Sequence, residues 1–264
     1  MYKILIFMII VIILFFVHMN NKQTKIVPKR VHKQTKIVPK PNMIHEQNKI
    51  TEIIKTKAQP TPKFYLITPS LPFDIYLFPD AITHDHCTRL RKDALQKLHK
   101  STIFKGYGGE EEIDIRDSMT GLLINDDTLL LQNIASILTG KPLTHIEFVQ
   151  ITKYEKDGKF DYHYDTDPLQ KHHPISSRIA TLMFYLNDDF EGGDTNFPYI
   201  HTTVIPTTSK AILFYSVLKG QLITDSIHRG NKVISGTKWI ANVWIHSCSI
   251  EMEKELYLER YRLL

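Results

Sequence analysis

From Thr144 onward the chain consists of short segments rich in β-branched and aromatic residues, separated by Gly, Pro, Asn and Asp. The former pack well on a pleated sheet, and the latter favour turns. Repeated short segments of this kind are typical of an all-β barrel or jelly roll. The expected strands are His145–Tyr154, Ile179–Leu186, Thr202–Ile205, Ala211–Val217 and Lys238–Ile245.

Helices are expected on either side of the β-rich part. Residues 80–100 carry an apolar stripe, and Thr83 could cap the N-terminus of a helix there. A second helix, at residues 126–138, would end at Thr139-Gly140, because glycine readily takes the left-handed conformation that closes a helix. A final helix is expected at residues 250–261.

These elements predict a folded domain at residues 64–264 that is mainly β with flanking helices (α+β). Its core would be a double-stranded β-helix, that is a jelly-roll or cupin-like barrel, at about residues 144–248, preceded by N-terminal helices. The length of 264 residues permits one large domain of this kind or two small ones.

The N-terminus has a different character. Ile4–Val17 is an uninterrupted run of 14 apolar residues, between the length of a signal-peptide core and that of a short membrane span. No small-x-small cleavage site follows, so we expect an uncleaved signal anchor at residues 1–19. Residues 20–63 are Lys-rich, contain Pro and repeat the octapeptide KQTKIVPK, which is typical of a flexible linker.

The net charge of +5 originates in the linker. Residues 18–63 carry 11 Lys and Arg against 2 acidic residues, whereas residues 64–264 carry 21 against 26. The folded part is therefore mildly acidic, which argues against nucleic acid as its main partner. A basic stretch beside an anchor could contact anionic lipid heads or be a solvated spacer. The positive-inside rule would keep this side of the membrane cytosolic.

The two cysteines, Cys87 and Cys248, form neither a disulfide framework nor a zinc-cluster pattern. One bridge would be open to them in an oxidising compartment. We favour the interpretation that they are two ordinary thiols.

His163-Tyr164-Asp165 and the distant His228 supply the residues of a 2-His-1-carboxylate triad. Such a triad binds Fe(II) on one face and leaves the other positions open. In a strand, residues i and i+2 share a face, so His163 and Asp165 can reach one ion while Tyr164 points away. The third ligand must then come from another strand. Zinc accepts the same ligands, so the pattern by itself leaves a zinc hydrolase open.

Four blocks around these residues agree in order and spacing with one family. Together they resemble the prolyl 4-hydroxylase-type 2-oxoglutarate/Fe(II) dioxygenases, over about residues 72–248. The blocks are Tyr154 to Asp165, Arg178 to Asp188, Glu191 to Pro198 (which contains Gly192-Gly193-Asp194-Thr195) and His228 to His246.

The resemblance implies that His163, Asp165 and His228 bind Fe(II). It also implies that Lys238 pairs with the distal carboxylate of 2-oxoglutarate, because a buried carboxylate needs a paired and hydrogen-bonded partner. Taken without the resemblance, Lys238 could be a surface strand lysine. A zinc hydrolase would give Lys238 no role.

Five further residues match positions of the family. Thr195 and Tyr154 would hydrogen-bond the distal carboxylate of 2-oxoglutarate, although Tyr154 could equally be a core tyrosine. Arg178 and His246 match positions that contact the peptide substrate, and Arg116 resembles a motif on the substrate side. Each of these last three could instead be a surface charge or a local cap.

The implied activity is the hydroxylation of a peptidyl proline at C4, with 2-oxoglutarate and O₂ consumed and succinate and CO₂ released. The substrate would be an extended, proline-rich or collagen-like peptide, and ascorbate would sustain the iron. By the same resemblance the protein would be a single-pass membrane protein of the endoplasmic reticulum or secretory pathway, with a lumenal domain, in conflict with the charge rule. Alternatives are a dioxygenase acting on lysine, a nucleobase or a small molecule, and a non-catalytic membrane-tethered barrel that binds peptides.

Overall fold

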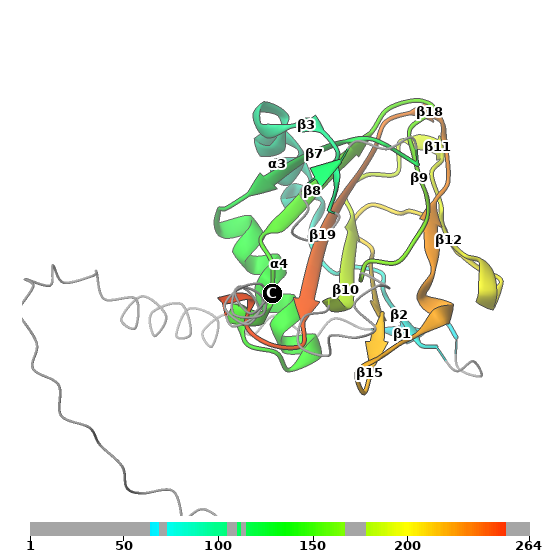
Figure 1. The fold of residues 1–264 in the computed structure, drawn as a ribbon. Coiled ribbons are helices and arrows are strands. Elements are labelled where there is room, and N and C mark those ends of the chain that lie inside the picture. Colours follow the sequence, from blue (N-terminus) through cyan, green and yellow to red (C-terminus); the bar gives the residue numbers. More distant parts are fainter. Residues whose placement is uncertain (1–63, 69–72, 105–109, 112–114, 167–177, 252–264) are drawn as a thin grey trace, which may run out of the picture. The chain divides into compact units, whose positions relative to one another are not determined.

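The computed structural model describes residues 64–68, 73–104, 110–111, 115–166 and 178–251. This part of the chain is mainly β-sheet with two longer helices, in agreement with the predicted class (Figure 1). The expected anchor and linker, residues 1–63, lie outside it. Within the described ranges, no helix combines the length and the apolar character that crossing a membrane requires.

The larger sheet has eight strands, and every neighbouring pair in it is antiparallel. In spatial order the strands are β1 (Tyr65–Leu66), β2 (Ile75–Phe78), β14 (Ala211–Tyr215), β10 (Arg178–Tyr185), β19 (Lys238–His246), β8 (Val149–Tyr154), β7 (Met119–Leu123) and β3 (His99–Lys100).

The smaller sheet has five antiparallel strands. In spatial order they are β13 (Thr202–Val204), β12 (Thr195–Phe197), β17 (His228–Gly230), β9 (Lys159–His163) and β6 (Arg116–Asp117). Three two-stranded ribbons pair β11 (Phe190–Gly192) with β18 (Val233–Gly236), β15 (Val217–Leu218) with β16 (Gln221–Leu222), and β4 (Ile103–Phe104) with β5 (Glu110–Glu111). Short 3₁₀ helices are η1 (Leu95–Lys97), η3 (Leu143–His145), η5 (Pro198–Ile200) and η6 (Thr224–Ser226).

Both expected helices before the β-rich part are present. In α3 (His84–Ala94) the predicted cap is confirmed, since the Thr83 side chain accepts a hydrogen bond from the His86 backbone. The helix is shorter than expected because the chain tightens into η1 and then pairs as β3 with β7. In α4 (Asp126–Thr139) the predicted end is also confirmed, with Gly140 in the left-handed conformation.

The expected strands are found with small differences at their ends. The segment predicted from His145 begins only at Val149, because residues 143–145 form the turn η3. Strands at His163 and at His228 were expected from the triad, without bounds, and are found as β9 and β17. The short strand β12 was not predicted, since a brief mixed sequence carries no clear period. Beyond its first two residues, the final helix expected at residues 250–261 lies outside the described part of the chain.

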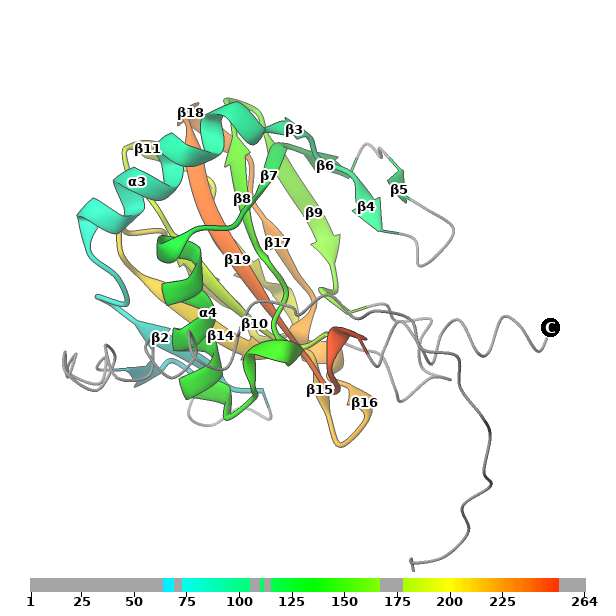
Figure 2. The same cartoon turned by 90° about the vertical axis from the view of Figure 1, so that its left-hand side faces the viewer.

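The larger sheet separates two apolar clusters. One lies against α3 and α4 and includes Leu90 and Leu131, and the other lies between the two sheets and includes Phe197 and Phe214. Figures 1 and 2 show α3 and α4 on one side of β8, β19 and β10, and the smaller sheet on the other. Ala241 of β19 belongs to the helix-side cluster, so alternate residues of this strand point between the sheets.

The two cysteines are not bridged. Cys87 is buried, and Cys248 is partly exposed.

Candidate active site between the two sheets

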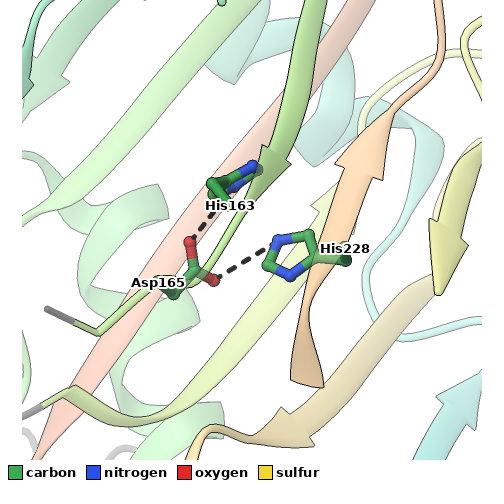
Figure 3. A group of neighbouring side chains, drawn as sticks. All are labelled: His163, Asp165 and His228. Carbon is green, nitrogen blue, oxygen red and sulfur yellow. Dashed lines mark ion pairs between the residues drawn. The ribbon is translucent and has the colours of Figure 1, made fainter. Parts of the chain in front are cut away.

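The three residues of the predicted triad meet between the sheets (Figure 3). His163 ends β9 and His228 begins β17, and the two are direct partners across the antiparallel pair. Asp165 lies in a bend beyond the end of β9, so the expectation that it shares a strand with His163 is wrong. Tyr164 points elsewhere, and its hydroxyl donates to the backbone carbonyl of Thr224 at 3.2 Å.

One carboxylate faces both imidazoles. His163 Nε2 lies 3.6 Å from Asp165 Oδ1, and His228 Nε2 lies 3.8 Å from Asp165 Oδ2. One ligand atom from each residue falls within 4.8 Å of the others. These separations are too long for good hydrogen bonds, but they allow one ion to touch all three groups.

Backbone carbonyls fix the orientation of both imidazoles. His163 Nδ1 lies 2.7 Å from the carbonyl oxygen of Asp161, and His228 Nδ1 lies 2.9 Å from that of Ser226. With the proton on Nδ1, each Nε2 presents its lone pair to Asp165. No sequence signal could have identified these partners, because every residue has a backbone carbonyl.

The protonation state of the cluster suits a divalent cation. Burial, together with the neighbouring His163, lowers the pKa of His228 to about 4, although Asp165 opposes the shift. Burial alone would raise the pKa of Asp165, but His228, His163 and a 2.5 Å hydrogen bond from Thr181 hold it well below its ordinary range. Neutral imidazoles and an ionised carboxylate are the forms that bind a metal. The residues therefore fit Fe(II), and Thr181 is a supporting residue that the sequence reasoning missed.

The triad borders a pocket that encloses about 450 Å³ of space, including the part open to solvent. Four of the other residues singled out from the sequence also line it, namely Arg116, Tyr154, Thr195 and Lys238. Arg178 and His246 are not among its lining residues.

Lys238 is a buried ammonium at this pocket. Its side chain comes from the first residue of β19, and Lys238 is only 2% exposed. Its Nζ donates to the carbonyl oxygen of Gly193 at 2.6 Å, and burial lowers the pKa of Lys238 to about 8 although Asp194 opposes the shift. A cation held mainly by a neutral carbonyl is well suited to binding an anionic ligand such as a carboxylate.

Two residues with hydroxyl groups, Tyr154 and Thr195, line the same pocket as this ammonium. Tyr154 is the cross-strand partner of Lys238, and burial raises the pKa of its phenol, so it stays a hydrogen-bond donor. Thr195 is also buried, and it accepts a 2.8 Å hydrogen bond from the hydroxyl of Tyr185. Tyr185 did not stand out in the sequence, because it lies in a continuous apolar strand. The predicted grouping of Lys238, Tyr154 and Thr195 at one pocket is present.

Arg116 is a second buried cation in the pocket wall. Its guanidinium donates to Ser118 Oγ, the Thr102 carbonyl and Gln150 Oε1, at 3.1, 3.2 and 3.2 Å respectively. It also lies 4.8 Å from the centre of the Phe160 ring. These partners are all neutral, and burial lowers the pKa of Arg116.

Arg178 and His246 form a charged cluster with Glu147 instead of lining the pocket. Arg178 binds both oxygens of Glu147, at 2.6 and 2.9 Å, and His246 Nε2 lies 2.6 Å from one of them. Burial would raise the pKa of Glu147, but Arg178 and His246 lower it to about 2. The guanidinium of Arg178 stacks 3.8 Å from the ring of Trp244, which does line the pocket. The cluster therefore adjoins the pocket, and Glu147 is its unpredicted centre.

Comparison with known proteins agrees with this site. A family model described as the 2OG-Fe(II) oxygenase superfamily matches residues 149–246. The chain is 31% identical over 208 residues to probable prolyl 4-hydroxylase 9 of Arabidopsis thaliana, covering 67% of this chain and 72% of that protein. It is 27% identical to the prolyl 4-hydroxylase alpha-1 subunit of Caenorhabditis elegans, of which it spans only 34%.

Solved structures show the same fold. A viral collagen prolyl hydroxylase from Paramecium bursaria Chlorella virus-1 matches with a TM-score of 0.53 and 25% identity, covering 66% of this chain and 90% of that one. A prolyl hydroxylase from Trichoplax adhaerens matches with a TM-score of 0.53 over 83% of this chain and 97% of its own. The second likeness, at 11% identity, concerns the fold alone.

Proposed function

Because this chain belongs to the prolyl 4-hydroxylase-type 2-oxoglutarate/Fe(II) oxygenases, we propose that it hydroxylates a peptidyl proline at C4. The reaction consumes 2-oxoglutarate and O₂ and releases succinate and CO₂. One observation carries the proposal, namely that a His-Asp-His cluster and a buried lysine share one pocket. This combination provides for a metal ion and for a dicarboxylate beside it.

His163, Asp165 and His228 are the proposed ligands of Fe(II). When bound, the metal with its co-substrate supplies the oxidative chemistry that places one oxygen atom on a C–H carbon. The protein contributes orientation, since the carbonyls of Asp161 and Ser226 hold the two imidazoles. Thr181 holds the carboxylate of Asp165 in the same way.

Lys238, Thr195 and Tyr154 are the proposed anchor for the distal carboxylate of 2-oxoglutarate. The burial of Lys238 strengthens an ion pair with that carboxylate, and the two hydroxyl groups can satisfy its remaining lone pairs. Holding this end fixes the opposite end of the co-substrate near the triad. Exclusion of water by the surrounding apolar side chains protects the reaction.

Arg116, Arg178 and His246 are the proposed substrate-side residues. Arg116 lies in the pocket wall, and the Arg178–Glu147–His246 cluster adjoins it through Trp244. Such charged and planar groups suit the carbonyl-rich backbone of an extended, proline-rich or collagen-like peptide.

We also propose the finer organisation of the chain. The two antiparallel sheets would form a double-stranded β-helix, within a catalytic domain at residues 64–264. The apolar run at residues 1–19 would be a single-pass anchor in the secretory pathway, with the basic segment 20–63 as spacer, and ascorbate would sustain the iron. The apolar run supports the anchor, the Lys-rich composition supports the spacer, and the family supports the location and the use of ascorbate.

The activity can be tested with purified protein, Fe(II) and 2-oxoglutarate. We expect poly-proline or collagen-like peptides to stimulate succinate formation, and mass spectrometry to find one added oxygen on proline. Lysine-containing peptides without proline are the comparison. If no proline peptide stimulates turnover, the proposed substrate is wrong.

A triad variant tests the metal site in the same assay. His163→Ala should abolish succinate formation and the rise in melting temperature that Mn(II) produces in the wild-type protein. His84→Ala, at the exposed start of α3, is the matched histidine control and should behave like wild type. Turnover that survives in His163→Ala would refute the assignment.

A further inference from the structure

One amide in the pocket wall has no role in the site described so far. Asn242 lies in the middle of β19, between Ala241 and Val243, which both pack in the helix-side core. Its own side chain therefore faces the pocket, which it lines. It is half-buried, and its amide makes no hydrogen bond within the described part of the chain.

The sheet register places this amide between the His163–Asp165–His228 triad and Arg116. Asn242 pairs with Met183 on β10 and with Gln150 on β8. Thr181 lies two residues before Met183 on the same face of β10, and its hydroxyl donates a hydrogen bond to Asp165. On the other side, Gln150 accepts the hydrogen bond from Arg116.

The depth of the pocket separates Asn242 from the lysine. Asn242 follows Lys238 by four positions in β19, so their Cα atoms lie roughly 13 Å apart along the strand. Five carbon atoms in an extended chain span only about 5 Å. A dicarboxylate held at Lys238 would therefore occupy the deep end, and Asn242 lies toward the mouth.

Trp244 adds a second polar group without a partner. It follows Asn242 by two residues on the same face of β19, roughly 7 Å further along the strand. It lines the pocket, and its buried indole Nε1 has no hydrogen-bond partner among the residues that the structure describes. In a polyproline II peptide, carbonyl groups two residues apart are separated by roughly 6 Å. The rise of the peptide over two residues is thus close to the separation of Asn242 and Trp244 along β19.

We propose that Asn242 binds the backbone of the peptide substrate beside the target proline, with its side-chain N–H donating to a carbonyl oxygen. The Trp244 N–H would donate to the carbonyl two residues away. The peptide bond that precedes a proline has a carbonyl oxygen but no N–H. It can therefore only accept a hydrogen bond, which the enzyme must donate. This inference rests on the proposed function and names how the substrate is held.

The absence of a partner argues against a packing role for Asn242. Burying an amide without hydrogen bonds costs free energy, and an aliphatic side chain would serve better in a wall formed by Met183 and Ile240. A ligand in the pocket would supply the hydrogen-bond partner that the described residues do not give Asn242.

The test compares two binding steps in one variant. Asn242→Leu keeps a similar size but removes the donor and the acceptor. We expect the KM for a collagen-like peptide to rise about tenfold or more. Calorimetric binding of 2-oxoglutarate to the Mn(II)-loaded protein without O₂ should be unchanged, as should turnover of 2-oxoglutarate without peptide. Asn196→Leu, on β12 outside the pocket lining, is the matched control.

The outcomes separate this inference from the proposed function. An unchanged peptide KM in Asn242→Leu overturns the inference, and so does weakened binding of 2-oxoglutarate, which would assign the amide to the co-substrate. If wild-type protein responds to no proline peptide, the proposed function itself fails. Asn242→Ser, which retains a donor, is the second variant if Asn242→Leu does not fold, and it should show a smaller rise in KM.

Discussion

At the scale of single residues, the candidate site depends on buried polar side chains whose orientation is fixed by hydrogen bonds to neighbouring groups. The two imidazoles are oriented by the carbonyls of Asp161 and Ser226, and the carboxylate of Asp165 by Thr181. These contacts set the geometry before any metal is bound, so little reorganisation is needed. Lys238 is different, because its ammonium has mainly the Gly193 carbonyl as partner.

Loss of the lysine should weaken binding of 2-oxoglutarate more than any other single change in the deep end of the pocket. In Lys238→Ala the dissociation constant, measured by calorimetry on the Mn(II) form without O₂, should rise roughly 10- to 100-fold, because a buried charge-assisted hydrogen bond is lost. Lys232→Ala removes an exposed lysine and should have no effect. Equal affinities in the two variants would contradict the assignment.

Glu147 should make stability depend on pH. Its pKa of about 2 lies below the ordinary 4.5, so the ionised carboxylate stabilises the fold above about pH 4.5. This contribution is lost as the pH falls through about 2. At pH 7, Glu147→Gln should lower the free energy of unfolding by about 2 kcal/mol, a value discounted for the partial exposure of the side chain.

The difference between Glu147→Gln and wild type should shrink as the pH is lowered from 4.5 toward 2, which urea denaturation at several pH values can follow. Glu191→Gln is the control, because Glu191 is exposed and bonds only Ser235 within the described residues. A difference that stays constant with pH would contradict the role of Glu147.

At the scale of elements, β19 organises the site. Its alternate residues enter opposite clusters, so Ala241 and Val243 anchor the strand against the helices while Lys238, Asn242 and Trp244 face the pocket. The partners on either side, β10 and β8, hold its register through antiparallel pairs. A slip of one residue would move all the polar groups into the helix-side core, so the pattern strongly specifies the register.

Gly192, the last residue of β11, should be more sensitive to substitution than Gly220, a glycine with the same φ angle. Gly192 and Gly220 both have φ of +75°. A Cβ at Gly192 would lie 2.4 Å from the carbonyl oxygen of Lys232, whereas nothing lies within 4 Å of one at Gly220. We expect Gly220→Ala to cost about 1 kcal/mol of unfolding free energy and Gly192→Ala more than about 3 kcal/mol.

Urea denaturation of the metal-free variants measures this difference. Gly192→Ala should also weaken 2-oxoglutarate binding, because the neighbouring Gly193 carbonyl holds Lys238. Equal losses of stability in the two variants would mean that dihedral strain, and not the close approach of Lys232, governs the turn.

At the scale of the whole molecule, the site is assembled from both sheets. The smaller sheet contributes His163 and His228, and the larger contributes Lys238 and Thr181. The apolar cluster between the sheets, with Phe197 and Phe214, holds the two halves together beside the metal cluster. Catalysis should therefore depend on this domain alone.

We expect the N-terminal segment, residues 1–63, to attach the protein to a membrane and to play no part in catalysis. Removal of residues 1–63 should leave kcat and the KM for peptide unchanged, while the protein no longer sediments with membranes. A second variant that lacks only residues 20–63 keeps the apolar run and should remain with the membranes. Membrane association that persists without residues 1–63, or a loss of activity on their removal, would contradict this expectation.

Sequence reasoning found much of the site because metal chemistry restricts the residues that can take part. The His-x-Asp pair, His228 and Lys238 were identified, and the structure brings them together. The pattern did not identify Glu147, Thr181, Tyr185 or Asn242. Glu147, Thr181 and Tyr185 contact partners that are distant in the sequence, and no local period marks such contacts. Asn242 is distinguished only by its position in the sheet.

The sequence by itself determined the class of fold, the two capped helices and the identity of the candidate metal ligands, because these depend on local period and on residue chemistry. Only the tertiary structure decided that Asp165 leaves its strand and that Arg178 and His246 bind Glu147 beside the pocket. It also decided which pocket-facing polar groups lack a partner among the described residues. These features follow from strand register and from the packing of two sheets, which fix distances between residues that the order of the chain leaves free.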